Sequence, residues 1–136
     1  MTRRSISTGS RYEELMGYSR AIVSHGHVFV SGCSGMPADV ETAGLGDAAS
    51  QFANAVTKVS AILALAGTSL ASVVRTRIYL TDADDWDALI AAHGLAFAAI
   101  RPACTMVQVS RLIDPRMRVE LEVTASLSGE AAAREP

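Results

Sequence analysis

Alternating apolar and polar residues between positions 101 and 125 predict two β-strands, separated by a turn at Ile113-Asp114-Pro115. One face of the second strand carries Met117, Val119, Leu121, Val123 and Ala125. The opposite face carries Glu120 and Glu122. A carboxylate in a strand that is apolar enough to lie inside a sheet is paired, solvated in a cleft or used in chemistry. We therefore expect the floor of any functional site in this region.

Further strands are predicted upstream. Residues 18–23 and 27–31 alternate in the same way around Ser24-His25-Gly26, which predicts a hairpin. Residues 5–8 predict a short edge strand and residues 73–80 a longer one. In the longer strand, one side carries Val74, Thr76, Ile78 and Leu80.

Two segments have the periodicity of amphipathic helices. In the first, residues 47–66, the apolar positions are Phe52, Val56, Val59, Leu63 and Ala66, and Gly67 is a stop signal. The second begins near Thr81-Asp82-Ala83-Asp84, which offers candidate N-caps, and cannot continue past Pro102. Its apolar stripe consists of Trp86, Leu89, Ile90, His93 and Phe97, which places His93 on the buried side.

The remaining segments have the composition of loops. Residues 12–16 and 36–46 are interpreted as connections, and residues 128–136 as a frayed tail. Two glycines in Ser31-Gly32-Cys33-Ser34-Gly35 indicate either unusual backbone dihedral angles or a close approach by another group.

The order of elements predicts a single domain of the α+β class over residues 1–136, with two helices on one face of the sheet. Hydrophobic residues make up 49% of the chain, and the mean hydropathy is +0.24. In a monomer the uncovered face of the sheet would expose apolar rows to water. We therefore expect copies of the chain to associate, with sites in the clefts between subunits.

Charge and hydropathy argue against several classes of partner. The net charge is −2, the twelve Lys and Arg residues are scattered, and aromatic residues are only 5%, so no nucleic-acid surface is expected. No signal peptide or membrane span is visible, which favours a cytoplasmic protein. Cys33, Cys104 and the three histidines lack metal-ligand spacing, so we expect reduced, buried thiols, no metal and no cofactor.

Five short blocks occur in the order and spacing of a known family. They are Gly17-Tyr18-Ser19-Arg20-Ala21, Val28-Phe29-Val30-Ser31-Gly32, Arg77-Ile78-Tyr79-Leu80-Thr81-Asp82, Arg101-Pro102-Ala103 and Val119-Glu120-Leu121-Glu122. Over about residues 5–127 the chain resembles the Rid family of reactive-intermediate deaminases, also called the YjgF-like or L-PSP endoribonuclease-like family. The resemblance implies a chorismate-mutase-like (YjgF-like) fold and a homotrimer with a central barrel-like core, in which small-molecule sites lie between subunits.

The resemblance also implies a chemistry and a set of site residues. Well-known members hydrolyse imines and enamines to carbonyl compounds and ammonia. By that pattern Glu120 activates water, Tyr18 positions the ligand or relays a proton, and the amides of Ser31 and Gly32 polarise the acceptor atom. The arginine that binds the substrate carboxylate in the family is replaced by Cys104.

The replaced arginine changes the expected substrate. An arginine–carboxylate contact is worth on the order of 1.5–3 kcal/mol. The sequence thus indicates an arginine-lacking subgroup, and a hydrolase acting on a small imine, enamine or related conjugated intermediate other than a standard 2-imino acid. Met106 is expected to wall the cleft.

Alternative interpretations remain open at the level of sequence. Cys104 with His93 as its base, or Cys33, would provide nucleophilic thiol catalysis. A non-catalytic trimer that binds a metabolite or regulates a partner enzyme is the main alternative to a hydrolase. An endoribonuclease is less favoured, because the sequence shows no basic patch.

The paired carboxylates also have a purely structural interpretation. Glu120 and Glu122 would then line a solvated barrel or form an inter-subunit salt bridge to Arg75 or Arg77.

Overall fold

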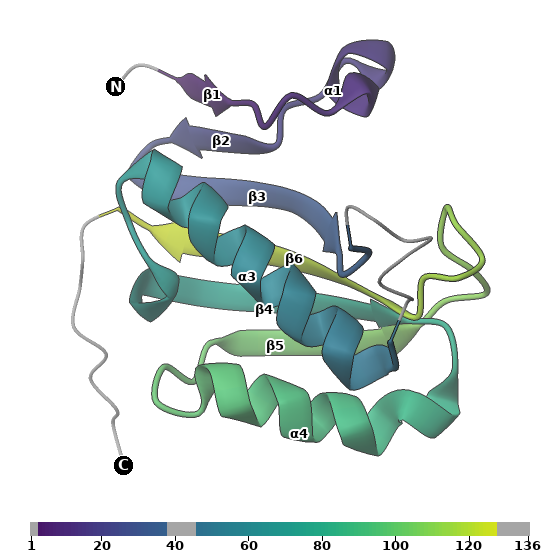
Figure 1. Cartoon of the computed structure of the whole chain (residues 1–136). Helices are drawn as coiled ribbons and strands as arrows, with labels where there is room; N and C mark the ends of the chain where they lie inside the picture. The colour runs from purple at the N-terminus through teal and green to yellow at the C-terminus, as the bar shows by residue number, and fades with distance from the viewer. Residues whose placement is uncertain (1–2, 38–45, 128–136) are drawn as a thin grey trace.

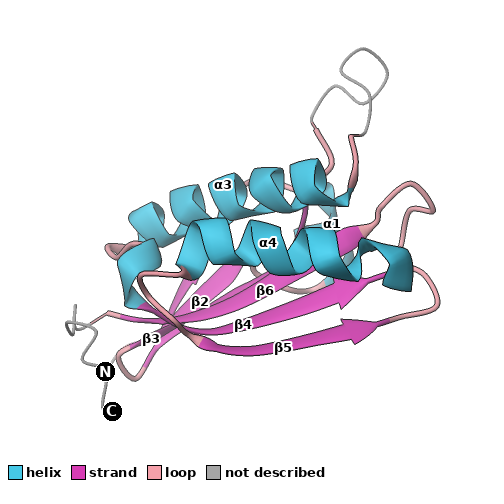
Figure 2. Ribbon diagram, turned by 90° about the horizontal axis from the view of Figure 1, so that it is seen from below, coloured by secondary structure: helices cyan, strands magenta, loops and turns pink. Residues whose placement is uncertain are grey.

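A computed structural model describes residues 3–37 and 46–127, and these form a six-stranded mixed sheet with helices on one face (Figures 1 and 2). The strands are β1 (Arg4–Ile6), β2 (Ala21–Ser24), β3 (His27–Ser34), β4 (Val73–Leu80), β5 (Ala103–Gln108) and β6 (Val119–Ser126). The helices are α1 (Arg11–Met16), α3 (Ala48–Ala66) and α4 (Trp86–Phe97), with short 3₁₀ turns η1 (Leu70–Ser72) and η2 (Ala83–Asp85). The predicted α+β class is confirmed. The parts of the predicted 36–46 loop and 128–136 tail that fall at 38–45 and 128–136 lie outside the described residues.

The sheet order is β1-β2-β3-β6-β4-β5. All neighbours are antiparallel except β4 and β5, which are parallel and connected through α4. The two strands predicted around Ile113-Asp114-Pro115 therefore exist but are not neighbours, because β4 lies between them. This arrangement gives β6 hydrogen-bonded partners on both edges and leaves β5 at the edge of the sheet.

The buried face of β6 follows the predicted alternation. Val119, Leu121, Val123 and Ala125 are at most 1% exposed and face α3 and the core, while Glu120 and Glu122 are half-buried on the alternate positions. The hairpin of β2 and β3 is also confirmed, and its turn residues His25 and Gly26 both have positive φ.

Helix α3 forms as its sequence predicts. The Asp47 carboxylate caps the helix by accepting from the Ser50 amide, and Gly67 ends it in the left-handed conformation. Phe52, Val59 and Leu63 are buried against the sheet. Helix α3 therefore covers one face of the sheet.

A short helix, α1, was missed by the interpretation of residues 12–16 as a connection. Its signal is a capping box: the Ser10 hydroxyl accepts from the helix backbone, and the Glu13 carboxylate accepts from the Ser10 amide. Gly17, in the left-handed conformation, ends the helix directly before Tyr18. The cap thus sets where β2 begins.

Two predicted burial patterns are partly wrong. In α4, Leu89 and Phe97 are buried, but Trp86 and Ile90 are 39% and 53% exposed, and the helix packs chiefly against α3. In β4, a register shift between Val73 and Arg75 buries Val73 and leaves Val74 exposed.

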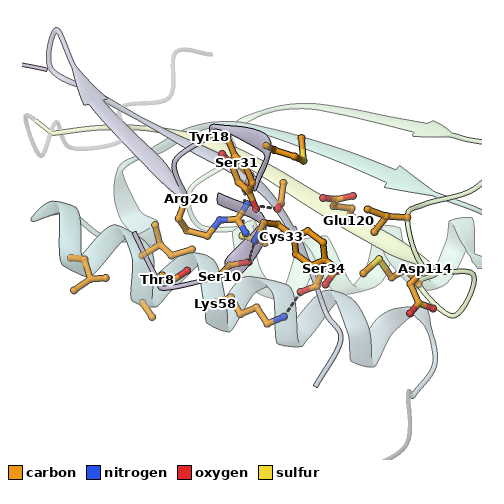
Figure 3. Close-up of a pocket in the computed structure, with 18 residues that line it drawn as sticks. Thr8, Ser10, Tyr18, Arg20, Ser31, Cys33, Ser34, Lys58, Asp114 and Glu120 are labelled. Carbon is orange, nitrogen blue, oxygen red and sulfur yellow. Dashed lines mark hydrogen bonds between the residues drawn. The ribbon is translucent and has the colours of Figure 1, made fainter. Parts of the chain in front are cut away.

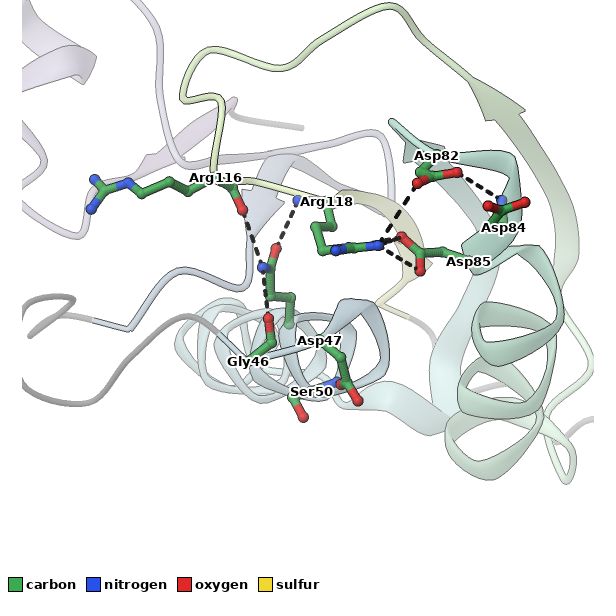
Figure 4. A network of polar contacts seen from close by, with 9 residues as sticks. Gly46, Asp47, Ser50, Asp82, Asp84, Asp85, Arg116 and Arg118 are labelled. Atoms are coloured by element: carbon green, nitrogen blue, oxygen red, sulfur yellow. Dashed lines mark hydrogen bonds and ion pairs between the residues drawn. The ribbon is translucent and has the colours of Figure 1, made fainter.

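A polar network holds the chain in position just before β6 (Figure 4). The fully buried Gln51 side chain donates to the carbonyls of Gly46 and Arg116 and accepts from the Arg118 amide at 2.9 Å. The Arg118 guanidinium makes a two-pronged contact with Asp85, with both distances 2.9 Å. These contacts fix the register of β6 two residues before Glu120.

Candidate functional site

A cavity of about 1020 Å³ lies beside β3, with walls from α1, α3 and the loop that precedes β6 (Figure 3). Five of the residues selected from sequence line it: Tyr18, Ser31, Gly32, Cys33 and Glu120. They come from β3, β6 and the segment before β2. The fold therefore brings distant parts of the chain to one site.

Glu120 is held in the sheet with its carboxylate at this cavity. Its Cα pairs with Ser34 of β3 and with Tyr79 of β4. Burial raises the pKa of Glu120 above the usual 4.5, Arg20 opposes that shift, and Glu122 adds to it. Within residues 3–37 and 46–127, no donor binds this carboxylate. A raised pKa and free lone pairs suit a general base.

Gly32 allows this placement. A Cβ atom at this position would overlap Glu120 Oε1 and lie 3.0 Å from its Cδ. Gly35 is equally constrained, because a Cβ there would overlap the backbone of Gln51. Of the two alternatives predicted for these glycines, the structure shows close approach by another group, since neither has a positive φ.

The two neighbouring carboxylates of β6 occupy different environments. Glu122 accepts a hydrogen bond of 2.8 Å from the Tyr79 hydroxyl and forms a 3.2 Å ion pair with Arg77. Glu122 therefore pairs with Arg77 as the structural interpretation expected, but within one chain rather than between subunits. Glu120 has no such partner among the described residues.

Arg20 is one of the cavity residues that the sequence did not identify as part of a site. Its Nη2 donates to the Gly32 carbonyl at 2.8 Å, and its guanidinium lies 5.3 Å from the centre of the Tyr18 ring. Its Nε is buried and has no partner in the described part of the chain. In the sequence Arg20 is part of the block Gly17-Tyr18-Ser19-Arg20-Ala21, but no local pattern distinguishes it there from a solvated arginine.

The Ser31 backbone does not offer the donor that the resemblance implied. Its amide donates to the Arg20 carbonyl at 3.0 Å, and its hydroxyl donates to the Ser19 carbonyl at 2.7 Å. The Ser31 amide is thus occupied within the hairpin. The expectation that the Ser31 amide polarises the acceptor atom is therefore wrong.

Cys33 and Lys58 complete the polar lining. The Cys33 thiol donates to the Ser31 carbonyl, and burial raises its pKa, so the thiolate form is disfavoured. Lys58 Nζ donates to the carbonyls of Ser34 and Met36 at 2.8 and 3.0 Å, and partial burial lowers its pKa. Lys58 therefore holds the end of β3 and the segment after it, whereas the Cys33 contact lies within the strand.

The other three predicted site residues do not line this cavity. Cys104 and Met106 lie on β5, paired with Thr76 and Ile78 of β4. In a single chain Cys33 is buried and Cys104 is exposed. The prediction of buried thiols is therefore confirmed for Cys33 and wrong for Cys104.

His93 has the environment of a core histidine. Its Nε2 lies 2.9 Å from the Thr76 hydroxyl, and its ring stacks near Phe97. Burial lowers the pKa of His93, which favours the neutral ring. The described residues contain no group of three His, Cys, Asp or Glu side chains placed to hold a metal, and none of their helices meets the length and apolarity that a membrane crossing requires.

Comparison with known proteins defines the class to which this fold and cavity belong. A family model described as endoribonuclease L-PSP matches residues 8–127. The chain therefore belongs to this family, the Rid or YjgF-like family.

Relatives cover nearly the whole chain. It is 34% identical over 122 residues to the uncharacterized protein SCO2049 of Streptomyces coelicolor, which spans 90% of each chain. It is 29% identical over 125 residues to the human 2-iminobutanoate/2-iminopropanoate deaminase, covering 92% of this chain and 90% of the human one. The crystal structure of Rv2704 from Mycobacterium tuberculosis, a member of the YjgF/YER057c/UK114 family, matches with a TM-score of 0.82 and 39% identity, over 92% and 99% of the two chains.

Proposed function

We propose that the chain is a hydrolase of small reactive imines or enamines and that Glu120 activates the attacking water. The observation that carries this proposal is the half-buried, unpaired Glu120 carboxylate at a cavity that Tyr18 also lines. A relative bears the name of a 2-iminobutanoate/2-iminopropanoate deaminase, which supports this reaction class.

The proposed reaction balances as imine plus water to carbonyl compound plus ammonia. Glu120 accepts a proton from water as the oxygen bonds to the imine carbon, and the nitrogen takes up that proton. The hydroxyl group of the resulting carbinolamine then passes its proton through Glu120 to the nitrogen, the C–N bond breaks with release of ammonia, and the remaining oxygen forms the C=O bond. The Tyr18 hydroxyl positions the ligand or relays the proton.

The proposal includes a homotrimer with clefts between subunits. The sheet face opposite α3 and α4 exposes Phe29 and Val107, which are 50% and 41% accessible in a single chain. Cover by further copies would remove these side chains from water. In such an assembly Cys104, which is exposed on the edge strand β5, would reach a site only across a subunit boundary, whereas Met106 and His93 pack against the core of their own chain. Light scattering after size-exclusion chromatography tests the trimer.

The activity is tested with imines generated in the assay. An amino-acid oxidase supplies imines that carry a carboxylate, and an amine oxidase supplies imines without one. Formation of the carbonyl product is followed with wild-type protein and with Glu120→Gln. Acceleration that disappears in the variant supports the proposal, and absence of acceleration by a folded protein with either class of imine would refute it.

Binding without turnover is the second candidate. It is favoured by the occupied Ser31 amide, which leaves one fewer donor for a developing charge. Saturable binding of a carbonyl product, together with an imine lifetime unchanged by the protein, would support this function instead.

A further inference from the structure

We infer that Arg20 binds an anionic group of the substrate, and that the mouth of the same cavity takes a large apolar substituent. This inference rests on the proposed function. It names the substrate class as 2-imino acids, or their enamines, with a bulky apolar side chain.

The first support is the state of the Arg20 donors. A guanidinium has five N–H donors in a planar fork that matches a carboxylate. Within the described residues only Nη2 has an acceptor, the Gly32 carbonyl, and the buried Nε has none. Buried donors of a charged group are normally paired. A ligand carboxylate in the cavity would accept from Nη1, which has no acceptor among the described residues and, unlike Nε, is not buried.

The second support is the balance of charge around the cavity. Four charged side chains line it: Arg20, Lys58, Asp114 and Glu120. Asp114 pairs with Arg116 at 2.8 Å, and Lys58 donates to two carbonyls. Arg20 and Glu120 are therefore the cation and the anion with capacity left for a ligand. Since an anionic ligand would repel Glu120, a cation beside both is required.

The third support is the size and character of the opening. About 1020 Å³ lies at the upper end of the roughly 300–1,000 Å³ of pockets that hold drug-sized ligands. Four large apolar side chains of the lining are exposed in the chain: Tyr12 by 46%, Met16 by 73%, Leu65 by 58% and Ile113 by 75%. Apolar surface gathered at a cavity marks a binding site. The opening therefore fits an aromatic or branched substituent better than a methyl group.

This inference changes the expectation that followed from Cys104. A substrate other than a standard 2-imino acid was expected because no arginine follows Pro102-Ala103. Arg20 supplies a cation from the segment directly before β2, at the same cavity as Glu120. A substrate carboxylate thus has a partner without residue 104.

The test compares imines that differ in one group at a time. An amino-acid oxidase generates them from alanine, leucine and phenylalanine, and an amine oxidase generates the carboxylate-free counterpart from phenethylamine. We expect the highest kcat/KM for the phenylalanine-derived imine. Arg20→Gln should lower kcat/KM for the carboxylate-bearing imines by roughly 10- to 100-fold and leave the phenethylamine-derived imine nearly unchanged, with partial recovery in Arg20→Lys.

The matched control is Arg11→Gln, which removes the same charge from α1 outside this cavity lining. It should keep the wild-type preference. Equal loss in Arg11→Gln and Arg20→Gln, or a wild-type preference for the alanine-derived imine, would overturn the inference.

A binding measurement separates failure of this inference from failure of the proposed hydrolysis. Calorimetry with phenylpyruvate and with phenylacetone, its carboxylate-free analogue, needs no turnover. Preferential binding of phenylpyruvate that Arg20→Gln abolishes, without any imine hydrolysis, would retain the inference and reject the hydrolase. Hydrolysis dependent on Glu120 but indifferent to the carboxylate and to Arg20 would do the reverse. If Arg20→Gln does not fold, equal wild-type affinity for the two ligands still overturns the inference.

Discussion

Gly32 and Glu120 occupy adjoining space so closely that residue 32 can carry no side chain without moving the Glu120 carboxylate. The contact joins β3 to β6 at the cavity. The absence of a side chain at residue 32 therefore allows the Glu120 carboxylate, the proposed base, to lie where it does.

Gly32→Ala should therefore fold and lose activity. The added methyl group meets the mobile end of a side chain, so the sheet can accept it, but the carboxylate must turn away from its position. We expect a fall in imine hydrolysis on the order of 10²-fold, the scale typical of a misplaced catalytic group. Steady-state kinetics and a thermal melt measure both effects.

Gly94→Ala is the control for this substitution. A Cβ at residue 94 meets nothing within 4 Å, and the position is inside α4. The variant should keep its activity and gain about 0.5–1 kcal/mol in stability. Wild-type turnover in Gly32→Ala would contradict the role given to the glycine.

The pH dependence of hydrolysis should report the environment of Glu120. Glu120 must be ionised to act as a base, and burial raises its pKa above the usual 4.5. The rate should therefore fall as the pH is lowered through this raised pKa. The acidic limb of kcat/KM against pH measures this pKa. An acidic limb at the ordinary glutamate value would contradict the description of the site.

The same shift predicts an effect on stability. Because the folded state binds the proton more tightly than the unfolded chain, ionisation of Glu120 weakens the fold as pH rises from the unfolded pKa through the folded one. Glu120→Gln should thus gain more stability at neutral pH than in acid. Chemical denaturation at several pH values tests this, and Glu122→Gln, which removes the acceptor of Tyr79 and Arg77, should show no such gain.

Gln51→Leu should destabilise the protein by about 2–4 kcal/mol, because the Arg118 amide and two carbonyls lose their buried partner. Urea denaturation gives the free energy of unfolding. Asn54→Ala, one turn along α3, removes a single 3.2 Å bond to Gly35 from an exposed residue and should cost about 1 kcal/mol or less. Equal losses in the two variants would contradict the role of the buried amide.

Asp85→Asn should cost roughly 0.5–1 kcal/mol, a small effect because the Arg118 side chain is 43% exposed and water screens the pair. A double-mutant cycle with Arg118→Gln isolates the coupling between the two side chains. The coupling should shrink at high salt. A coupling that salt leaves unchanged would show that the contact acts through shape rather than charge.

Much of the fold followed from local pattern. The burial of β6 and the limits of α3 depend on alternation, helical periodicity, the Asp47 cap and the Gly67 stop, all of which are properties of neighbouring residues. The order of the strands in the sheet could not be predicted from local pattern. Whether β6 pairs with β5 or with β4 depends on contacts between segments far apart in sequence, and the β4 bulge that exposes Val74 depends on the same pairing.

The residues of the site also fall into those that the sequence identified and those that depend on the three-dimensional fold. Tyr18, Ser31, Gly32 and Glu120 were selected through family resemblance and lie together at the cavity. Arg20 was not selected, because its importance arises only where the Gly32 carbonyl and Glu120 converge on it in three dimensions.

The most direct test of the central claim compares Glu120→Gln with Glu122→Gln in one imine-hydrolysis assay. Both variants remove one carboxylate from alternate positions of β6, but only Glu120 lines the cavity. We predict that Glu120→Gln abolishes protein-dependent ammonia release while Glu122→Gln retains most of it. Wild-type ammonia release by a folded Glu120→Gln protein would contradict the assignment of Glu120 as the base.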